Sequence, residues 1–159
     1  MARHVERPII FPLSNPTERI EAIPADLIKW TDGRALIGTG TPWPPVAHRG
    51  AEYAIGQANN ALVYPGIGLG TIVARASRVT DAMLLTAAEA IAGLVDTNAL
   101  GAALLPDVSN LRASSATVAV AVARQAANDG VAQVDLADPV QAVQDAMWQA
   151  RYAELEGTS

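Results

Sequence analysis

Two short, uninterrupted apolar runs, separated by a segment with helical spacing, constrain the fold of this chain most. Residues 9–11 (Ile-Ile-Phe) and 35–39 (Ala-Leu-Ile-Gly-Thr) are typical of strands buried on both faces of a parallel sheet. Residues 17–30 lie between them with apolar residues at helical intervals and a break at Pro24. A β-α-β order with a crossover of this length predicts two parallel strands and a right-handed connection. We therefore expect an α/β fold.

The amino-acid composition changes once along the chain. Proline and glycine punctuate the first 70 residues, whereas the chain from Thr80 onward is rich in alanine, which makes up 32 of the 159 residues. We expect one domain over 1–159, with a strand-and-loop half over about 1–70 and a helical half over about 71–159. Only two or three strands can be counted, fewer than a covered parallel sheet needs, which suggests that part of the sheet is missing from the chain.

Two further helices are predicted by their capping residues. Thr80 can cap a helix with apolar residues at intervals of three and four, and Asp138, followed by a proline and a glutamine, can cap another. The buried faces expected for these helices are Met83, Leu84, Ala87, Ala88, Ile91, Leu94 and Val95 in the first, and Val140, Val143, Met147 and Trp148 in the second.

Two segments admit alternative structures. Residues 115–128 are rich in alanine and precede Gly130, which favours a helix, although alternating valines over 118–122 argue weakly for a strand. Residues 53–64 either hold a third strand around 61–63 or form an irregular loop.

Charge and residue content exclude several kinds of site. The formal net charge is −5 and the 11 basic residues are scattered, so we expect neither nucleic acid nor a membrane as a partner. The chain has no cysteine, no run of apolar residues long enough to span a bilayer, and no signal-peptide pattern, and we expect a soluble, cytoplasmic protein. His4 and His48 lie far apart and the carboxylates form no cluster, so no metal site is expected within it.

Ser14 and Asn15 directly follow the predicted strand over residues 9–13, which places them at the carboxyl end of a parallel strand. Ligands bind at such ends in open α/β sheets. The local alternative is that Asn15 caps a helix that begins at Pro16, with Glu18 completing a capping box.

Asn59 and Asn60 form a second candidate site. Their amides offer uncharged donors and acceptors that suit a carboxylate or a carboxamide, and the alternative is a turn with left-handed backbone. The three alternating glycines of residues 66–70 invite a dinucleotide-binding interpretation, but Thr71 occupies the place of the third fingerprint residue. We interpret these glycines as sites where a helix packs closely on its neighbour.

Five segments, in this order along the chain, resemble the C-terminal part of the malic enzymes. They are RPIIFPLSNPT over 7–17, WTDGRAL over 30–36, IGQANNA over 55–61, YPGIGLG over 64–70 and MWQARY over 147–152. The Ser-Asn-Pro-Thr form is most similar to the NAD-linked, malate-oxidising branch, and the malolactic enzymes share these motifs.

The resemblance implies the C-terminal part of a Rossmann-like, parallel-sheet NAD-binding domain, followed by C-terminal helices. Malic enzymes oxidise and decarboxylate (S)-malate to pyruvate and CO₂; NAD accepts the hydride, and Mg²⁺ or Mn²⁺ binds malate. The family's motif asparagines map onto Asn15 and Asn59 for the cofactor, and onto Asn15, Asn59 and Asn60 for the substrate.

The family's catalytic lysine and tyrosine, its metal carboxylates and its glycine-rich pyrophosphate loop all precede the segment that this chain resembles. The resemblance therefore implies no catalytic and no metal-binding residue here, and a chain that is inactive alone. Its expected partners are the remainder of a malic enzyme chain and, at full length, further copies in a homo-oligomer. Two alternatives are a malolactic enzyme, which ends at lactate and CO₂, and a non-catalytic remnant that acts as an interaction module.

Overall fold

A three-stranded parallel sheet organises the first part of the computed structural model, which describes residues 1–150. The order is β1-β2-β5, with β1 over Ile9–Ile10, β2 over Leu36–Thr39 and β5 over Gly56–Gln57. Both pairings are parallel, with Ile9 opposite Leu36 and Gly38 opposite Gly56. The predicted α/β fold is confirmed, but the third strand is β5, and 61–63 is not a strand.

The connection between β1 and β2 contains a short 3₁₀ helix, η1 (Thr17–Arg19), and helix α1 (Pro24–Trp30). Pro24 is the first residue of α1, where its missing N–H and fixed φ are tolerated, so the predicted break is a helix start. Leu27 and Ile28 of α1 belong to one buried cluster with Ile37 of β2, which fixes the helix on the sheet.

A small antiparallel hairpin, unpredicted by the sequence analysis, follows the sheet's second strand. It consists of β3 (Val46–His48) and β4 (Ala51–Tyr53). Arg49 and Gly50 form its two-residue turn with φ of 50° and 80°, the positive values that favour tight hairpins. Strands of three residues carry too little periodicity to stand out in the sequence.

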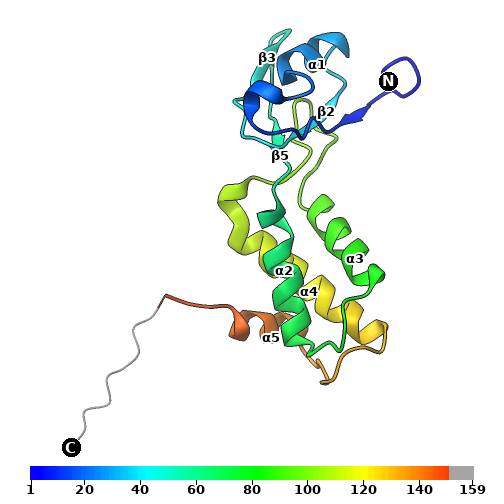
Figure 1. The fold of residues 1–159 in the computed structure, drawn as a ribbon, viewed down its shortest axis with the longest axis vertical. Coiled ribbons are helices and arrows are strands. Elements are labelled where there is room, and N and C mark those ends of the chain that lie inside the picture. Colours follow the sequence, from blue (N-terminus) through cyan, green and yellow to red (C-terminus); the bar gives the residue numbers. More distant parts are fainter. Residues whose placement is uncertain (151–159) are drawn as a thin grey trace, which may run out of the picture.

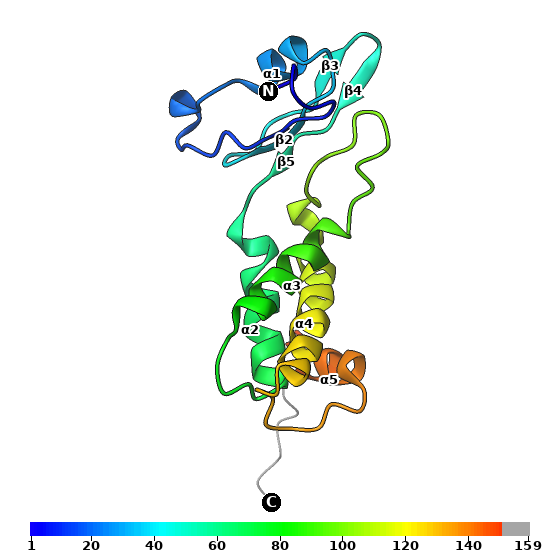
Figure 2. The same cartoon turned by 90° about the vertical axis from the view of Figure 1, so that its right-hand side faces the viewer.

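Four helices build a second lobe (Figure 1). They are α2 (Tyr64–Val73), α3 (Asp81–Ala92), α4 (Leu111–Asn128) and α5 (Pro139–Ala146), with the 3₁₀ helices η2 (Asn60–Leu62) before α2 and η3 (Val108–Asn110) before α4. Figure 2 shows α2, α3 and α4 side by side, with α5 across the end far from the sheet. The weak strand alternative within 115–128 is wrong, because α4 is continuous there.

The two lobes have separate hydrophobic clusters joined by two passages of the chain. Residues 58–62 lead from β5 into α2, and the segment between α3 and α4 returns to the sheet (Figure 2). On that return, Gly101 accepts a hydrogen bond from the Ala54 N–H at 2.9 Å. Leu105 lies over Gly56, where a Cβ added to the glycine would be 2.9 Å from the Leu105 nitrogen. These contacts anchor the helical lobe to the sheet.

The glycines of residues 66–70 act as the sequence predicts at two positions of three. A Cβ at Gly66 would lie 2.5 Å from Val118 Cβ, and one at Gly70 would lie 2.5 Å from the Ala119 carbonyl oxygen. Both glycines therefore let α2 approach α4 closely. Gly68 faces open space, since a Cβ added there would meet nothing within 4 Å, so the packing interpretation is wrong at that position.

Both predicted helix caps are confirmed, while the predicted buried faces are too broad. Thr80 Oγ1 accepts a hydrogen bond from the Met83 N–H at 3.1 Å, and Asp138 Oδ1 accepts two at 3.0 Å. The predicted face residues that are exposed are Leu84, Ala88 and Leu94 on or just beyond α3, and Val140 and Trp148 on or just beyond α5. Only part of each helix meets a neighbour among residues 1–150.

Two sequence predictions reach beyond the described residues. Arg151 and Tyr152 of the closing motif, and the last residues of the predicted helical half, lie outside the range 1–150. None of the helices formed by residues 1–150 combines the length and hydropathy that crossing a bilayer requires.

Candidate functional site

The carboxyl ends of β1, β2 and β5 lie at one edge of the sheet, because all three strands are parallel. The Gly40 N–H donates to the Pro12 carbonyl oxygen at 3.3 Å, and the Ala58 N–H donates to the Thr39 carbonyl oxygen at 2.8 Å. The segments that leave the three strands therefore touch one another. Open α/β sheets bind ligands at this kind of edge.

Asn15 lies in the segment that leaves β1 and is exposed. Residue Pro16, joined to it by a cis peptide bond, precedes η1, and no side chain caps that helix. The helix-cap alternative for Asn15 is therefore wrong. Its carboxamide lies beside the segment that leaves β2, since a Cβ at Gly40 would be 3.2 Å from Asn15 Oδ1.

Gly40 is a residue of this edge that the sequence analysis did not single out. A Cβ there would collide with the Leu13 carbonyl oxygen, so only glycine fits between the β1 and β2 segments. Its carbonyl oxygen also accepts a hydrogen bond from Gln57 Nε2 at 3.5 Å. The available signal was a glycine directly after the predicted strand 35–39, at the position where a neighbouring strand end approaches.

Ser14 is held by Glu21, from the segment between η1 and α1. Ser14 Oγ donates to Glu21 Oε1 at 2.8 Å, and the Ser14 N–H donates to Glu21 Oε2 at 3.1 Å. Hydrogen bonds from the Glu21 backbone N–H, then from the Ser14 hydroxyl and N–H, lower the pKa of the Glu21 carboxyl. A carboxylate thus fixes the residue next to Asn15.

Asn59 and Asn60 lie just beyond the carboxyl end of β5, and both are exposed. The Asn59 backbone is extended, with φ −116° and ψ 130°, and its Oδ1 accepts a hydrogen bond from the Ala61 N–H at 2.9 Å. Neither residue has a positive φ, so the left-handed turn alternative is wrong. Asn59 caps η2 and still has its Nδ2 available as a donor towards a ligand.

The structure brings these residues to one edge without joining the asparagines directly. Within residues 1–150, no hydrogen bond links the Asn15 side chain to Asn59 or Asn60. The turn at Gly40 lies between the two motifs, since it contacts Asn15 on one side and Gln57 on the other. The arrangement offers amide donors and acceptors, and no acid–base pair.

Metal binding is not supported by the described part of the chain. Among residues 1–150, no group of three or more histidine, aspartate or glutamate side chains could hold a metal ion. His48 lies in β3, with Nε2 3.3 Å from Asp32 Oδ1 and its ring edge-on to Tyr53. These contacts make His48 a structural residue of the hairpin.

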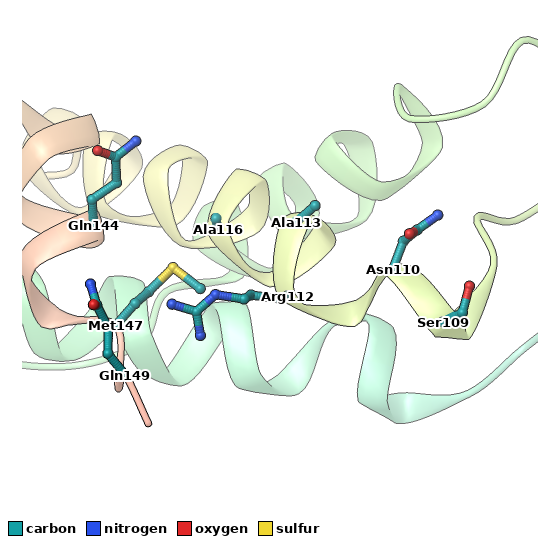
Figure 3. Close-up of a pocket in the computed structure, with 8 residues that line it drawn as sticks. All are labelled: Ser109, Asn110, Arg112, Ala113, Ala116, Gln144, Met147 and Gln149. Carbon is teal, nitrogen blue, oxygen red and sulfur yellow. The ribbon is translucent and has the colours of Figure 1, made fainter. Parts of the chain in front are cut away.

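A hollow of about 540 Å³ lies in the helical lobe beside α4 and the end of α5. Figure 3 shows Arg112 and Met147 near its middle, Asn110 at one end and Gln144 at the other. Arg112 Nη1 donates to the Trp148 carbonyl oxygen at 2.9 Å. Its lining holds no carboxylate and no histidine, so these residues provide no acid–base chemistry.

A parallel sheet with polar segments at its carboxyl edge places the chain among the ligand-binding α/β proteins. The family model described as the NAD-binding domain of malic enzyme matches residues 1–127. The chain belongs to this family, which confirms the predicted resemblance and its Rossmann-like fold.

Individual relatives agree with the family. The chain is 58% identical over 155 residues to NAD-dependent malic enzyme 3 of Bacillus subtilis (strain 168), covering 98% of this chain and 27% of that protein. It is 51% identical over 152 residues to the malolactic enzyme of Leuconostoc mesenteroides, covering 96% of this chain and 28% of that protein. The chain thus spans little more than a quarter of the length of these relatives.

Solved structures show the same fold. The malic enzyme of Pyrococcus horikoshii Ot3 matches with a TM-score of 0.66 and 29% identity, over 87% of this chain and 28% of that chain. The malic enzyme of Entamoeba histolytica matches with a TM-score of 0.69 and 27% identity, over 88% of this chain and 26% of that chain.

Proposed function

We propose that this chain works within a longer NAD-dependent malic enzyme, which oxidises and decarboxylates (S)-malate to pyruvate and CO₂ with reduction of NAD. The observation that carries the proposal is the family match over residues 1–127, supported by 58% identity to a protein named NAD-dependent malic enzyme 3. In this proposal residues 1–159 are one portion of the cofactor-binding domain, with the sheet lobe and helical lobe as its halves.

The chain's contribution in this proposal is to bind and orient ligands. Asn15 and Asn59 hold the nicotinamide end of NAD, and Asn15, Asn59 and Asn60 hold the malate carboxylate. A carboxamide can donate to a carboxylate and can pair with the carboxamide of nicotinamide. Because Asn59 Oδ1 already accepts from the Ala61 N–H, its Nδ2 is the group offered to a ligand. NAD, when bound, supplies the hydride acceptor.

The rest of the chemistry is assigned to the remainder of the longer chain. The described residues do not fit a metal site, so we propose that the ligands of Mg²⁺ or Mn²⁺ lie elsewhere, with the catalytic lysine and tyrosine. The 159-residue chain is then inactive alone. The same proposal includes a cytoplasmic location and a homo-oligomer at full length.

A second candidate is a malolactic enzyme, in which malate ends as lactate and CO₂. It is favoured by 51% identity to the Leuconostoc mesenteroides protein of that name. The two candidates share this chain's ligand-binding roles and differ in the product.

The proposal is tested on the full-length polypeptide that carries this sequence, incubated with malate, NAD and Mn²⁺. We expect pyruvate and a rise in NADH absorbance; lactate without net NADH would favour the malolactic candidate. If neither pyruvate nor lactate forms, the result would support a non-catalytic remnant and contradict the proposal. NADH formation by the purified 159-residue chain would contradict its predicted inactivity.

Substitution of the asparagines tests their roles. We expect N15A and N59A to raise KM for NAD and malate, and N60A to raise KM for malate, each about five- to tenfold, the effect of a lost hydrogen bond. N128A, at the exposed end of α4, is the matched control and leaves both constants unchanged. The assigned roles would be rejected if the KM values of the three variants equalled those of N128A.

A further inference from the structure

Thr39 is a buried polar residue whose hydroxyl forms a hydrogen bond within the turn at the sheet edge. It is the last residue of the central strand β2 and is 0% exposed. Its Oγ1 donates to the Thr41 carbonyl oxygen at 2.8 Å, with the Gly56 carbonyl oxygen as a longer alternative acceptor at 3.4 Å. Burial of a hydroxyl is unfavourable unless it is hydrogen-bonded, so this bond holds the turn from 39 to 41 in one conformation.

Gly40, at the centre of that turn, lies between the two asparagine motifs. Its N–H donates to the Pro12 carbonyl oxygen at 3.3 Å, and its carbonyl oxygen accepts from Gln57 Nε2 at 3.5 Å. A Cβ at Gly40 would lie 3.2 Å from Asn15 Oδ1, so the path of this turn sets the space available to the Asn15 carboxamide.

The far side of the turn reaches the segment that follows Asn15. Thr41 Oγ1 lies 3.3 Å from Thr17 Oγ1 of η1. The turn thus contacts the chain before Asn15 through Pro12, and the chain after it through Thr17. A shift of residues 40 and 41 would move both flanks of Asn15.

We propose that Thr39 is a positioning residue: its hydroxyl holds the Gly40 turn in the place that orients the Asn15 carboxamide towards its ligand. This inference rests on the proposed function, in which Asn15 binds malate and the nicotinamide end of NAD. Thr39 itself is buried and touches no ligand, so its effect passes through Asn15.

The test uses the full-length polypeptide and compares T39V, which removes the hydroxyl at nearly constant volume, with T39S, which keeps it. We expect T39V to raise KM for malate about five- to tenfold with kcat within about twofold of the unsubstituted protein. T39S restores KM to within about twofold. T117V removes an exposed hydroxyl on α4 and is the matched control without effect.

A double-mutant cycle with N15A decides whether Thr39 acts through Asn15. In the N15A background, T39V should change KM by less than about twofold. Q57L removes the side-chain hydrogen bond that the Gly40 carbonyl oxygen accepts. It should raise KM for malate when Asn15 is present and change it by less than about twofold in the N15A background, which keeps the test decisive if T39V does not fold.

The inference and the proposed function fail in different ways. If N15A leaves KM for malate and NAD unchanged, the proposed function fails and the inference fails with it. If N15A raises KM but T39V or Q57L multiplies that effect independently, only the inference is overturned. A T39V protein with a lower melting temperature and unchanged KM would also overturn it, since Thr39 would then be merely structural.

Discussion

At the residue scale, side chains near the candidate site are held by hydrogen bonds on an exposed surface. Glu21 is the clearest case, since its carboxylate accepts two hydrogen bonds from Ser14, the neighbour of Asn15. Asp107 is similar on the other passage between the lobes: hydrogen bonds from the Ser109 N–H and then its hydroxyl lower the pKa of this carboxyl. Such bonds order loops without a hydrophobic core, and they depend on ionisation.

We predict that acid releases Ser14 from Glu21. The Glu21 pKa is lowered from 4.5, first by its own backbone N–H and then by Ser14. The stabilisation is therefore fully present above pH 4.5 and is lost as the pH falls through the lowered folded-state pKa. An NMR titration of the Ser14 amide measures this midpoint, and E21Q should abolish the transition. A midpoint at or above 4.5 in the unsubstituted protein would contradict the prediction.

At the element scale, the helical lobe depends on the close approach of α2 to α4. Two glycines of α2 face α4, and the third faces open space. The facing part of α4 is a fully buried row of small and β-branched residues that includes Val118, Ala119 and Val122. Close-packed interiors tolerate added volume poorly, so the three glycines should respond differently to the same substitution.

We predict that G70A destabilises the protein by about 1–3 kcal/mol, because the new Cβ would lie 2.5 Å from the Ala119 carbonyl oxygen and 2.8 Å from Val122 Cβ. G68A is the matched control in the same helix. It should be neutral or stabilising by up to about 1 kcal/mol, because alanine favours the helix and nothing opposes its side chain. Thermal unfolding of both variants measures the difference, and equal melting temperatures would refute the packing argument.

At the scale of the whole molecule, the described chain leaves apolar surface uncovered. β1 is an edge strand of the sheet, and Ile9, Phe11 and Leu13, on or just beyond it, are 52%, 46% and 48% exposed. In the helical lobe, Tyr64, Ile72 and Leu85 are more than 60% exposed. Unpaired strand edges and contiguous apolar surface promote association.

We therefore predict that the isolated 159-residue chain associates with itself. Light scattering after size-exclusion chromatography should give a mass that rises with concentration. I9K should reduce this association, since a charge on an edge strand opposes pairing. A monodisperse monomer with a single sharp melting transition would contradict the prediction.

Local chemistry explains which parts of the fold were predictable. The starts of α3 and α5 follow from Thr80 and Asp138, whose side chains bond to N–H groups two or three residues away. The two apolar runs contain β1 and β2. The burial expected on both faces holds for Ile37, Gly38 and Thr39 of β2. It is wrong for β1 within residues 1–150, where Ile9 is 52% exposed. The candidate residues Asn15, Asn59 and Asn60 were found from motifs, and their ligand-binding roles remain predictions.

The sequence by itself determined the elements whose signals lie within a few residues, namely the helix caps and the short apolar runs. Which glycines of α2 face α4 was decided by the tertiary structure, since Gly66 and Gly70 do and Gly68 does not. Only the tertiary structure decided what depends on neighbours distant along the chain. β5 is a strand because Gly56 and Gln57 lie beside β2, and Pro16 rather than Asn15 is the N-cap residue of η1. Pairing and burial are properties of two surfaces that meet, and one segment of sequence describes only one of them.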